Sequence, residues 1–298
     1  MQRIAIAIAA SLAAGSLFAQ TVPDAIAHDP APDKAHPAAM LAEAIPSHGD
    51  NLNAVFYAAA GAGRHPTVVL FHGLPGNEQN LDLAQAIRRD AWNVLTLHYR
   101  GSWGTPGAFS FTHCVEDGAA AVAWLRDPAS PVAGRIDAKR IVVIGHSMGG
   151  FVAGMTGGHD DGVMATGLIS AANIGPTIGG LPRTTAAKVV DDNIGTSAGM
   201  HALAGTSPQI LGDEAIAAIA TLDFDNGAAT LARHPLLLVT SDDGLAGDSA
   251  ALARAVRKAG GSALTEVHIA TDHGYSDKRI ALEAAVLAWL ERLPGVVR

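Results

Sequence analysis

A serine flanked by glycines is the residue in this chain best suited to nucleophilic chemistry. Ser147 lies in the hexapeptide Gly145–Gly150 (GHSMGG), which follows the apolar run Arg140–Ile144 (RIVVI) and precedes a stretch expected to be helical. A serine on a sharp strand-to-helix turn projects its hydroxyl above the sheet, and glycines on both sides avoid collisions within the turn. The helix N-terminus behind it would favour a developing negative charge. The alternative is an ordinary turn in which Ser147 caps the helix.

A serine hydroxyl is a weak nucleophile and needs a base. In enzymes that use this turn, the acid and the base follow the serine along the chain. The histidines after Ser147 stand at positions 159, 201, 234, 268 and 273. His273 comes just after a predicted strand and before the last predicted helix, at the sheet edge toward which the serine points. We therefore predict His273 as the base; the alternative is a surface loop histidine.

Two neighbouring carboxylates compete to orient that histidine. Asp242 and Asp243 follow the predicted strand at 236–240. Neighbouring residues in an extended loop point in opposite directions, so only one of the two can face His273. We favour Asp243, which stands three residues past the strand, and Asp242 remains the alternative. Asp272, adjacent to the histidine, is expected to cap a turn.

A tetrahedral intermediate needs backbone N–H donors around its oxyanion. The amide after the nucleophile, that of Met148, is one candidate. The loop at 71–77 (FHGLPGN) offers the other. Gly73 permits close approach of the backbone, and Leu74 has a free N–H, whereas the proline that follows it has none. We therefore assign Leu74 as the second donor, with Gly73 as the fallback. His72 is expected to hydrogen-bond within this loop.

The rest of the sequence must place these residues at one sheet edge. From about residue 50, short apolar runs alternate with segments of helical periodicity, which predicts an α/β fold with a mostly parallel central sheet and helices on both faces. Strands are predicted over 53–59, 67–71, 92–98, 140–144, 166–170, 236–240 and 264–269. Helices are predicted over 77–89, 113–126, 147–156, 249–259 and 278–293.

An inserted segment interrupts this alternation at about 174–233. It is rich in Gly, Thr, Pro and Asp, and one helical stretch is expected over 213–222. Insertions on the carboxyl side of such a sheet overhang the ligand crevice, so we predict a lid. The alternative is an insertion with only a stabilising role.

The N-terminal residues predict a signal peptide over 1–19, because a short charged start is followed by an apolar run and small residues. Ala19 precedes the preferred cleavage site, and Ala25–Ala27 is a second candidate. The alternative is an uncleaved anchor helix. A flexible, proline-rich leader is expected over 20–49, and the catalytic domain over 50–298. A periplasmic or secreted location follows, without stable membrane insertion after cleavage.

Composition excludes several classes of protein. Of the 298 residues, 49% are hydrophobic and 16% charged, which supports a sizeable core. The net charge of -8 comes without a basic stripe, so we expect no nucleic acid partner. Cys114 is the single cysteine, which excludes an intramolecular disulfide. The 13 histidines show no H-E-x-x-H or other compact metal spacing, so no metal is expected.

Together these motifs resemble the α/β-hydrolase superfamily, over about 50–173 and 234–295. The resemblance is carried by His72-Gly73, the GHSMGG turn, the Asp242-Asp243 loop, Asp272-His273-Gly274, and the loop at 99–104 (YRGSWG), which looks like that of the esterase and oligopeptidase-like branches. The superfamily implies acyl transfer through an acyl-enzyme, without a cofactor, on a small-molecule ester or amide. Thr240 departs from the pattern, because relatives often carry glycine there.

The favoured hypothesis is a serine hydrolase acting on carboxylic esters. An aminopeptidase or oligopeptidase is the second hypothesis, in which Asp191, Asp192 or Asp213 would hold a free amino terminus. A non-catalytic binding protein on the same fold is the third. A dehalogenase is disfavoured, because that chemistry places a carboxylate where Ser147 stands.

Overall fold

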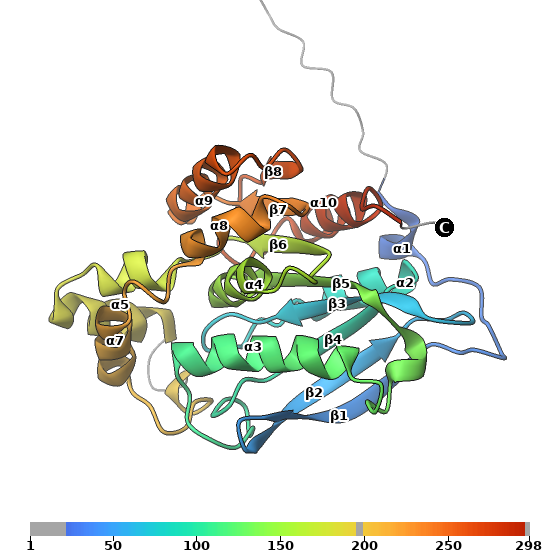
Figure 1. Ribbon diagram of the computed structural model, residues 1–298, viewed down its shortest axis with the longest axis horizontal. Coiled ribbons are helices and arrows are strands. Elements are labelled where there is room, and N and C mark those ends of the chain that lie inside the picture. Colours follow the sequence, from blue (N-terminus) through green and yellow to red (C-terminus); the bar gives the residue numbers. More distant parts are fainter. Residues whose placement is uncertain (1–21, 195–198, 296–298) are drawn as a thin grey trace, which may run out of the picture.

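An eight-stranded sheet runs through the middle of the molecule in the order β1-β2-β4-β3-β5-β6-β7-β8 (Figure 1). In the computed structural model, which describes residues 22–194 and 199–295, β1 and β2 pair antiparallel, as do β2 and β4. The other neighbouring strands are parallel, which confirms the predicted fold class. The strands are β1 (Ala39–Ser47), β2 (Asp50–Ala58), β3 (His65–Phe71), β4 (Asn93–Leu97), β5 (Ile136–His146), β6 (Ala165–Ile169), β7 (Leu236–Thr240) and β8 (Leu264–His268).

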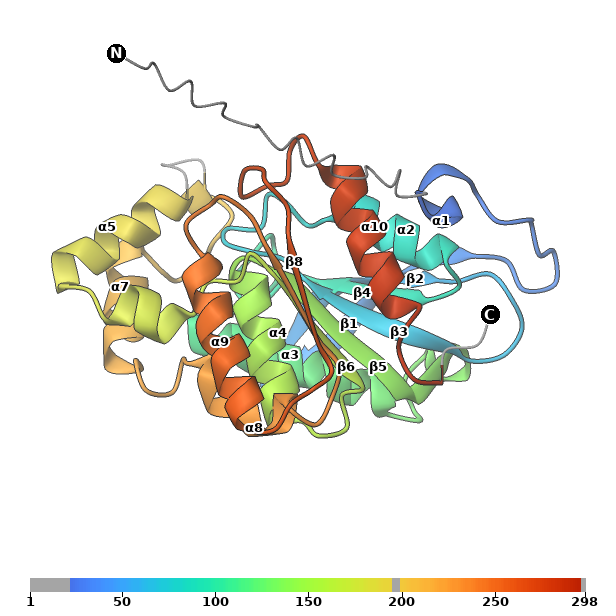
Figure 2. The same ribbon diagram turned by 90° about the horizontal axis from the view of Figure 1, so that it is seen from above.

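Helices cover both faces of this sheet (Figure 2). Helices α3, α4 and α9 pack into the core on one face, and α1, α2 and α10 into the core on the other. The helices are α1 (Asp24–Ala27), α2 (Leu81–Arg89), α3 (Phe111–Arg126), α4 (Met148–His159), α5 (Arg183–Ile194), α7 (Pro208–Ala217), α8 (Ala228–Leu231), α9 (Ala246–Lys258) and α10 (Arg279–Leu290). None of the helices in the described part of the chain has the length and apolar character needed to cross a bilayer.

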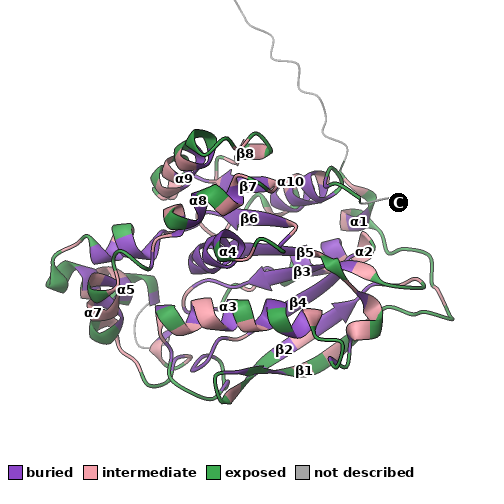
Figure 3. Cartoon of the chain, in the orientation of Figure 1, coloured by how far each residue is buried: buried purple, intermediate pink, exposed green. Residues whose placement is uncertain are grey.

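Burial explains why the central elements were visible in the sequence. In β4 and β6 every residue is buried, as is β3 apart from its first residue. A strand covered on both faces gives a continuous apolar run rather than an alternating one. Helix α4 is buried from Met148 to Gly158, and Figure 3 shows it enclosed between the sheet and its neighbours. The site is therefore built on a rigid centre.

The leader predicted over 20–49 is wrong for Ala39–Ser47, which form β1 and pair with β2 along its whole length. β1 is an edge strand of the sheet, and Pro46, which has no N–H, is tolerated there. Asp24–Ala27 form α1, whose Ala25 carbonyl accepts a hydrogen bond from Arg89 Nε. The predicted signal peptide lies outside the described residues.

The insertion at 174–233 contains more helix than the sequence predicts. It holds α5, α7, α8 and two short turns, η2 (Gly175–Gly179) and η3 (Phe224–Gly227). The stretch expected over 213–222 corresponds to α7, which starts earlier and ends at Ala217. Glu214 of α7 accepts hydrogen bonds from the amides of Phe111 and Thr112, so the insertion is fastened to the start of α3.

Candidate active site

The turn that carries Ser147 is strained in the way the motif requires. Ser147 has φ 59° and ψ −125° between β5 and α4, a conformation that L-residues seldom adopt. Its amide donates to Ile169 O over 2.9 Å, which fixes the turn to β6. The Ser147 side chain makes no capping hydrogen bond to α4, so the alternative of a helix-capping serine is wrong.

Backbone crowding explains the glycines beside the serine. A Cβ on Gly145 would lie 1.9 Å from Gly149 O, and a Cβ on Gly149 would lie 2.2 Å from Phe71 O. Both distances are far below van der Waals contact, so any larger residue would force the backbone apart. The predicted need for glycine on both sides of the turn is confirmed.

The structure brings Asp243 and His273 together from loops that follow β7 and β8. His273 Nδ1 lies 2.8 Å from Asp243 Oδ2. The Asp243 side chain is 4% exposed and that of His273 is 41% exposed. A buried carboxylate on Nδ1 holds the ring in the tautomer whose Nε2 can accept a proton.

Several donors converge on the Asp243 carboxylate. Burial raises its pKa, but hydrogen bonds from His273, from the Leu245 amide, and from the Ser170 and Ser241 hydroxyls together bring the pKa below its ordinary value. The Leu245 amide lies 2.9 Å from Asp243 Oδ1. The Ser170 hydroxyl also meets Tyr275 Oη at 2.8 Å. Asp243 is therefore held ionised in a fixed position.

Asp242, the other candidate acid, points away from His273. Its Oδ1 lies 3.3 Å from His268 Nε2, and both side chains are more than half exposed. The two neighbouring carboxylates thus contact two different histidines, as expected for neighbours in an extended loop. Asp272 accepts a hydrogen bond from the Ser276 amide, which confirms its predicted turn-capping role.

The residue before the nucleophile contacts the histidine directly. His146 Nε2 donates to His273 O over 2.7 Å, and the two ring centroids are 4.7 Å apart. Burial lowers the pKa of His146 to about 4, so its ring is neutral at neutral pH and Nε2 carries the donated proton. Among the described residues, no hydrogen bond joins Ser147 Oγ to the His273 ring. Catalytic hydrogen bonds are often long in free enzymes and tighten with substrate.

The β3–α2 loop (residues 72–80) passes beside the serine. A Cβ on Gly73 would lie 2.9 Å from Ser147 Cβ and 3.4 Å from its Oγ, so glycine is needed for this approach. In the described part of the chain, the amides of Leu74 and Met148 donate to no acceptor. Both N–H groups are therefore free for a developing oxyanion.

His72 orients one of these amides. Its Nδ1 donates to Gly73 O over 2.8 Å, which confirms the predicted hydrogen bond within the loop. Burial lowers the pKa of His72 to about 4, so Nε2 is free to accept from His98 Nδ1, 3.3 Å away. The C=O and N–H of a trans peptide point in opposite directions. Holding Gly73 O toward His72 therefore turns the Leu74 N–H the other way.

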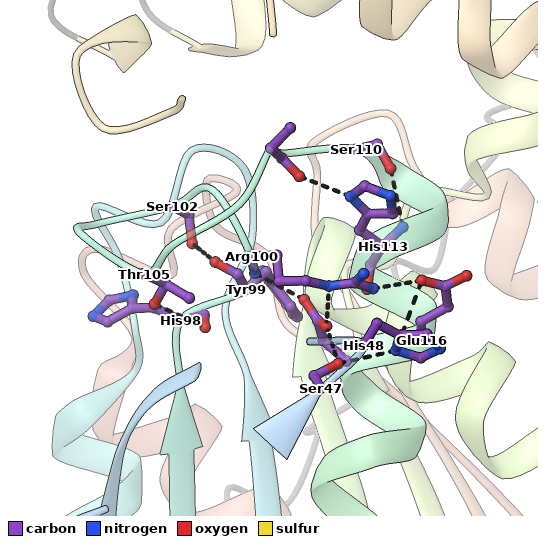
Figure 4. Close-up of polar contacts among 12 residues, drawn as sticks. Ser47, His48, His98, Tyr99, Arg100, Ser102, Thr105, Ser110, His113 and Glu116 are labelled. Carbon is purple, nitrogen blue, oxygen red and sulfur yellow. Dashed lines mark hydrogen bonds and ion pairs between the residues drawn. The ribbon is translucent and has the colours of Figure 1, made fainter. Parts of the chain in front are cut away.

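A buried ion pair holds the loop after β4, residues 98–110 (Figure 4). Arg100 Nε lies 2.7 Å from Asp117 Oδ1, and the Arg100 amide donates to Asp117 Oδ2 over 2.8 Å. Ser47 Oγ also donates to Asp117. The same loop carries Trp103, whose Nε1 donates to Pro75 O over 2.8 Å. The ion pair therefore holds the loop after β4, and the Trp103 side chain of this loop contacts the β3–α2 loop.

We expect Asp117→Ala to lower the free energy of unfolding by about 3 to 5 kcal/mol, because it strands a buried guanidinium. Asp117 is 0% exposed and Arg100 is 6% exposed. Glu116→Ala is the matched control: it removes the half-exposed partner of the same arginine and should cost at most about 1 kcal/mol. Urea denaturation measures both values. Equal losses for the two variants would contradict this ranking.

Sequence reasoning missed the residues that support the acid. Ser170 and Ser241 each come directly after a buried strand, β6 and β7, and contact each other through their hydroxyls at 3.0 Å. Ser170 also has φ 42°. Their position at the carboxyl ends of neighbouring parallel strands was the available signal. Among the described residues, no group of His, Cys, Asp or Glu is arranged to hold a metal ion.

The fold of this chain has counterparts among known proteins. A model of the alpha/beta hydrolase family matches residues 68–292, and this chain belongs to that family. No curated protein sequence matches it significantly.

Three solved structures are similar in fold. A Pyrococcus horikoshii acylaminoacyl peptidase is 16% identical, with a TM-score of 0.64 over 86% of this chain and 42% of that chain. A puromycin-hydrolyzing peptidase of Mycobacterium tuberculosis is 18% identical, with a TM-score of 0.62 over 89% and 41%. A Pyrococcus furiosus esterase is 15% identical, with a TM-score of 0.62 over 90% and 97%. This chain therefore spans less than half of the two peptidases.

Proposed function

We propose that this chain is a serine hydrolase that cleaves carboxylic esters through an acyl-enzyme on Ser147. The observation that carries the proposal is the buried Asp243 carboxylate on His273 Nδ1, in a loop that contacts the residue next to the strained serine. A carboxylate, an imidazole and a serine at one sheet edge form the constellation used for acyl transfer. Membership of the alpha/beta hydrolase family supports it.

In the proposed mechanism, His273 takes the Ser147 proton through Nε2 as Oγ attacks the ester carbonyl carbon. The Leu74 and Met148 amides stabilise the oxyanion, and Asp243 stabilises the imidazolium. The imidazolium gives its proton to the departing alcohol, which leaves the acyl group on Ser147 Oγ. A water molecule that loses a proton to His273 then attacks the acyl-enzyme, the proton returns to Ser147 Oγ, and the acid is released.

Two observations favour esters over peptides. The Pyrococcus furiosus esterase is matched over nearly its whole length, whereas the peptidases are more than twice as long as the part matched. A peptidase would need a carboxylate of the insertion to hold the amino terminus of its substrate, and two of the three candidates are already paired, Asp192 with Lys188 and Asp213 with Arg183. An amide hydrolase remains the second candidate because the peptidases share the fold.

A substrate panel tests the proposal. We expect the protein to hydrolyse nitrophenyl esters of short acids faster than aminoacyl anilides, and a fluorophosphonate probe to attach to Ser147. Peptide mapping by mass spectrometry identifies the labelled residue. Faster anilide cleavage would favour the peptidase, and absence of both labelling and turnover would favour a non-catalytic binding protein.

The proposal includes a lid formed by the insertion at 174–233. A lid that closes over the site predicts slower amide exchange in α5 once a phosphonate occupies Ser147. Unchanged exchange would contradict the lid.

The proposal also includes export of the chain after cleavage behind Ala19, which N-terminal sequencing of periplasmic protein tests. A mature protein that still begins at Met1 would contradict export by cleavage.

A further inference from the structure

Two successive carbonyls next to the catalytic histidine are each held by a side chain. His273 O accepts from His146 Nε2 over 2.7 Å, and Gly274 O accepts from Arg279 Nη1 over 3.0 Å. The first contact ties the histidine loop (residues 269–278) to the residue beside Ser147. The second ties it to Arg279, the first residue of α10, which the proposed mechanism does not use.

Arg279 reaches from this loop to the start of α2. Its Nε lies 2.7 Å from Asp82 Oδ2, and its Nη2 lies 2.6 Å from Asp82 Oδ1. The same Nη2 donates to Asn80 Oδ1 over 3.0 Å. Asn80 is buried, has φ 54°, and closes the β3–α2 loop, which contains Leu74. All three guanidinium nitrogens are thus engaged, with acceptors in two separate segments.

Such a planar, bidentate arrangement is specific to arginine, because a lysine ammonium is a point charge that cannot span these acceptors together. The Arg279 side chain is 22% exposed and the Asp82 side chain 40%, so the contacts are partly shielded from water. The geometry therefore fixes a distance between the histidine loop and the loop that carries the oxyanion donor.

We propose that Arg279 is a positioning residue. It holds His273 at a fixed position relative to the β3–α2 loop through its contacts with Gly274 O, Asn80 and Asp82. The inference rests on the proposed function of Ser147 and His273. A misplacement of about 1 Å between catalytic groups can cost about 100-fold in rate. Loss of Arg279 should accordingly slow every step in which His273 moves a proton, and leave substrate binding largely intact.

The test compares Arg279→Gln and Arg279→Lys with a matched control, Arg140→Gln. Arg140 also joins one carboxylate, that of Asp137, to one distant carbonyl, that of Gly295, and is 27% exposed. It lies in the first half of β5, away from the carboxyl edge of the sheet. The measurements are kcat and KM on a short nitrophenyl ester, the rate constant of fluorophosphonate labelling, and the melting temperature.

We expect Arg279→Gln to lower kcat and the labelling rate by about 10-fold to 100-fold, with KM changed less than about 3-fold. For Arg279→Lys, kcat and the labelling rate should lie between those of Arg279→Gln and wild type. These two rates provide the test if Arg279→Gln does not fold. Arg140→Gln should match wild type in both rates even if its melting temperature falls.

Wild-type rates in a folded Arg279→Gln protein would overturn the inference, and so would a loss shared equally by Arg140→Gln. Failure of the proposed function looks different, because wild-type protein would then not be labelled at Ser147 at all.

Discussion

We expect Ser147→Ala to lower kcat for nitrophenyl esters by about four to six orders of magnitude, because no other nucleophile can form the acyl-enzyme. Labelling by a fluorophosphonate should disappear as well. The residual rate would come from the free Leu74 and Met148 amides and from substrate binding. Initial rates on purified variant and wild type give the ratio directly.

The variant should remain folded, which makes the kinetic result interpretable. Ser147 Oγ makes no capping hydrogen bond, so its removal strands no partner in α4. Alanine keeps a Cβ, and the strained φ of 59° is held by the surrounding turn rather than by the hydroxyl. Thermal unfolding close to that of wild type is the control. A folded Ser147→Ala protein with undiminished esterase activity would remove Ser147 from the mechanism.

The central fold could be predicted because its strands are buried on both faces. Residues 236–240 show this well: LLLVT is a continuous apolar run, and β7 has those bounds. β1 could not be recognised in the same way, since it is an edge strand in which no residue over Ala39–Ala44 is fully buried, and Pro46 lies near its end. Its stability comes from pairing with β2, a non-local interaction that a single segment does not reveal.

A residue of the candidate site could be predicted from the sequence where its type has few other roles at that position in the chain. The glycines beside Ser147 and the histidine after β8 are such cases, and the structure places both at one sheet edge. Arg279 is different, because an arginine at the start of a helix has many ordinary roles. Two of its acceptors, Asp82 and Asn80, lie about 200 residues earlier in the chain, and only the folded structure brings them to Arg279.

Asp243→Asn provides the second large effect. We expect kcat to fall by about 10,000-fold, because an amide can neither hold the required tautomer of His273 nor stabilise its positive form. Asp243 lies 2.8 Å from the ring and is 4% exposed, so water cannot replace it readily. The change is isosteric, and the Ser170 and Ser241 hydroxyls can reorient toward the amide. Measurement of kcat across pH 6 to 9 shows whether any pH restores the rate.

Asp242→Asn is the matched control for this variant, since it makes the same change one peptide away. Asp242 contacts the exposed His268 instead, and exposed pairs of this kind contribute little. Its kcat should stay within about threefold of wild type. A larger loss in Asp242→Asn than in Asp243→Asn would mean that the loop after β7 rearranges when substrate binds, so that Asp242 faces His273. A large loss in both variants would contradict the assignment of Asp243 as the one carboxylate that acts on His273.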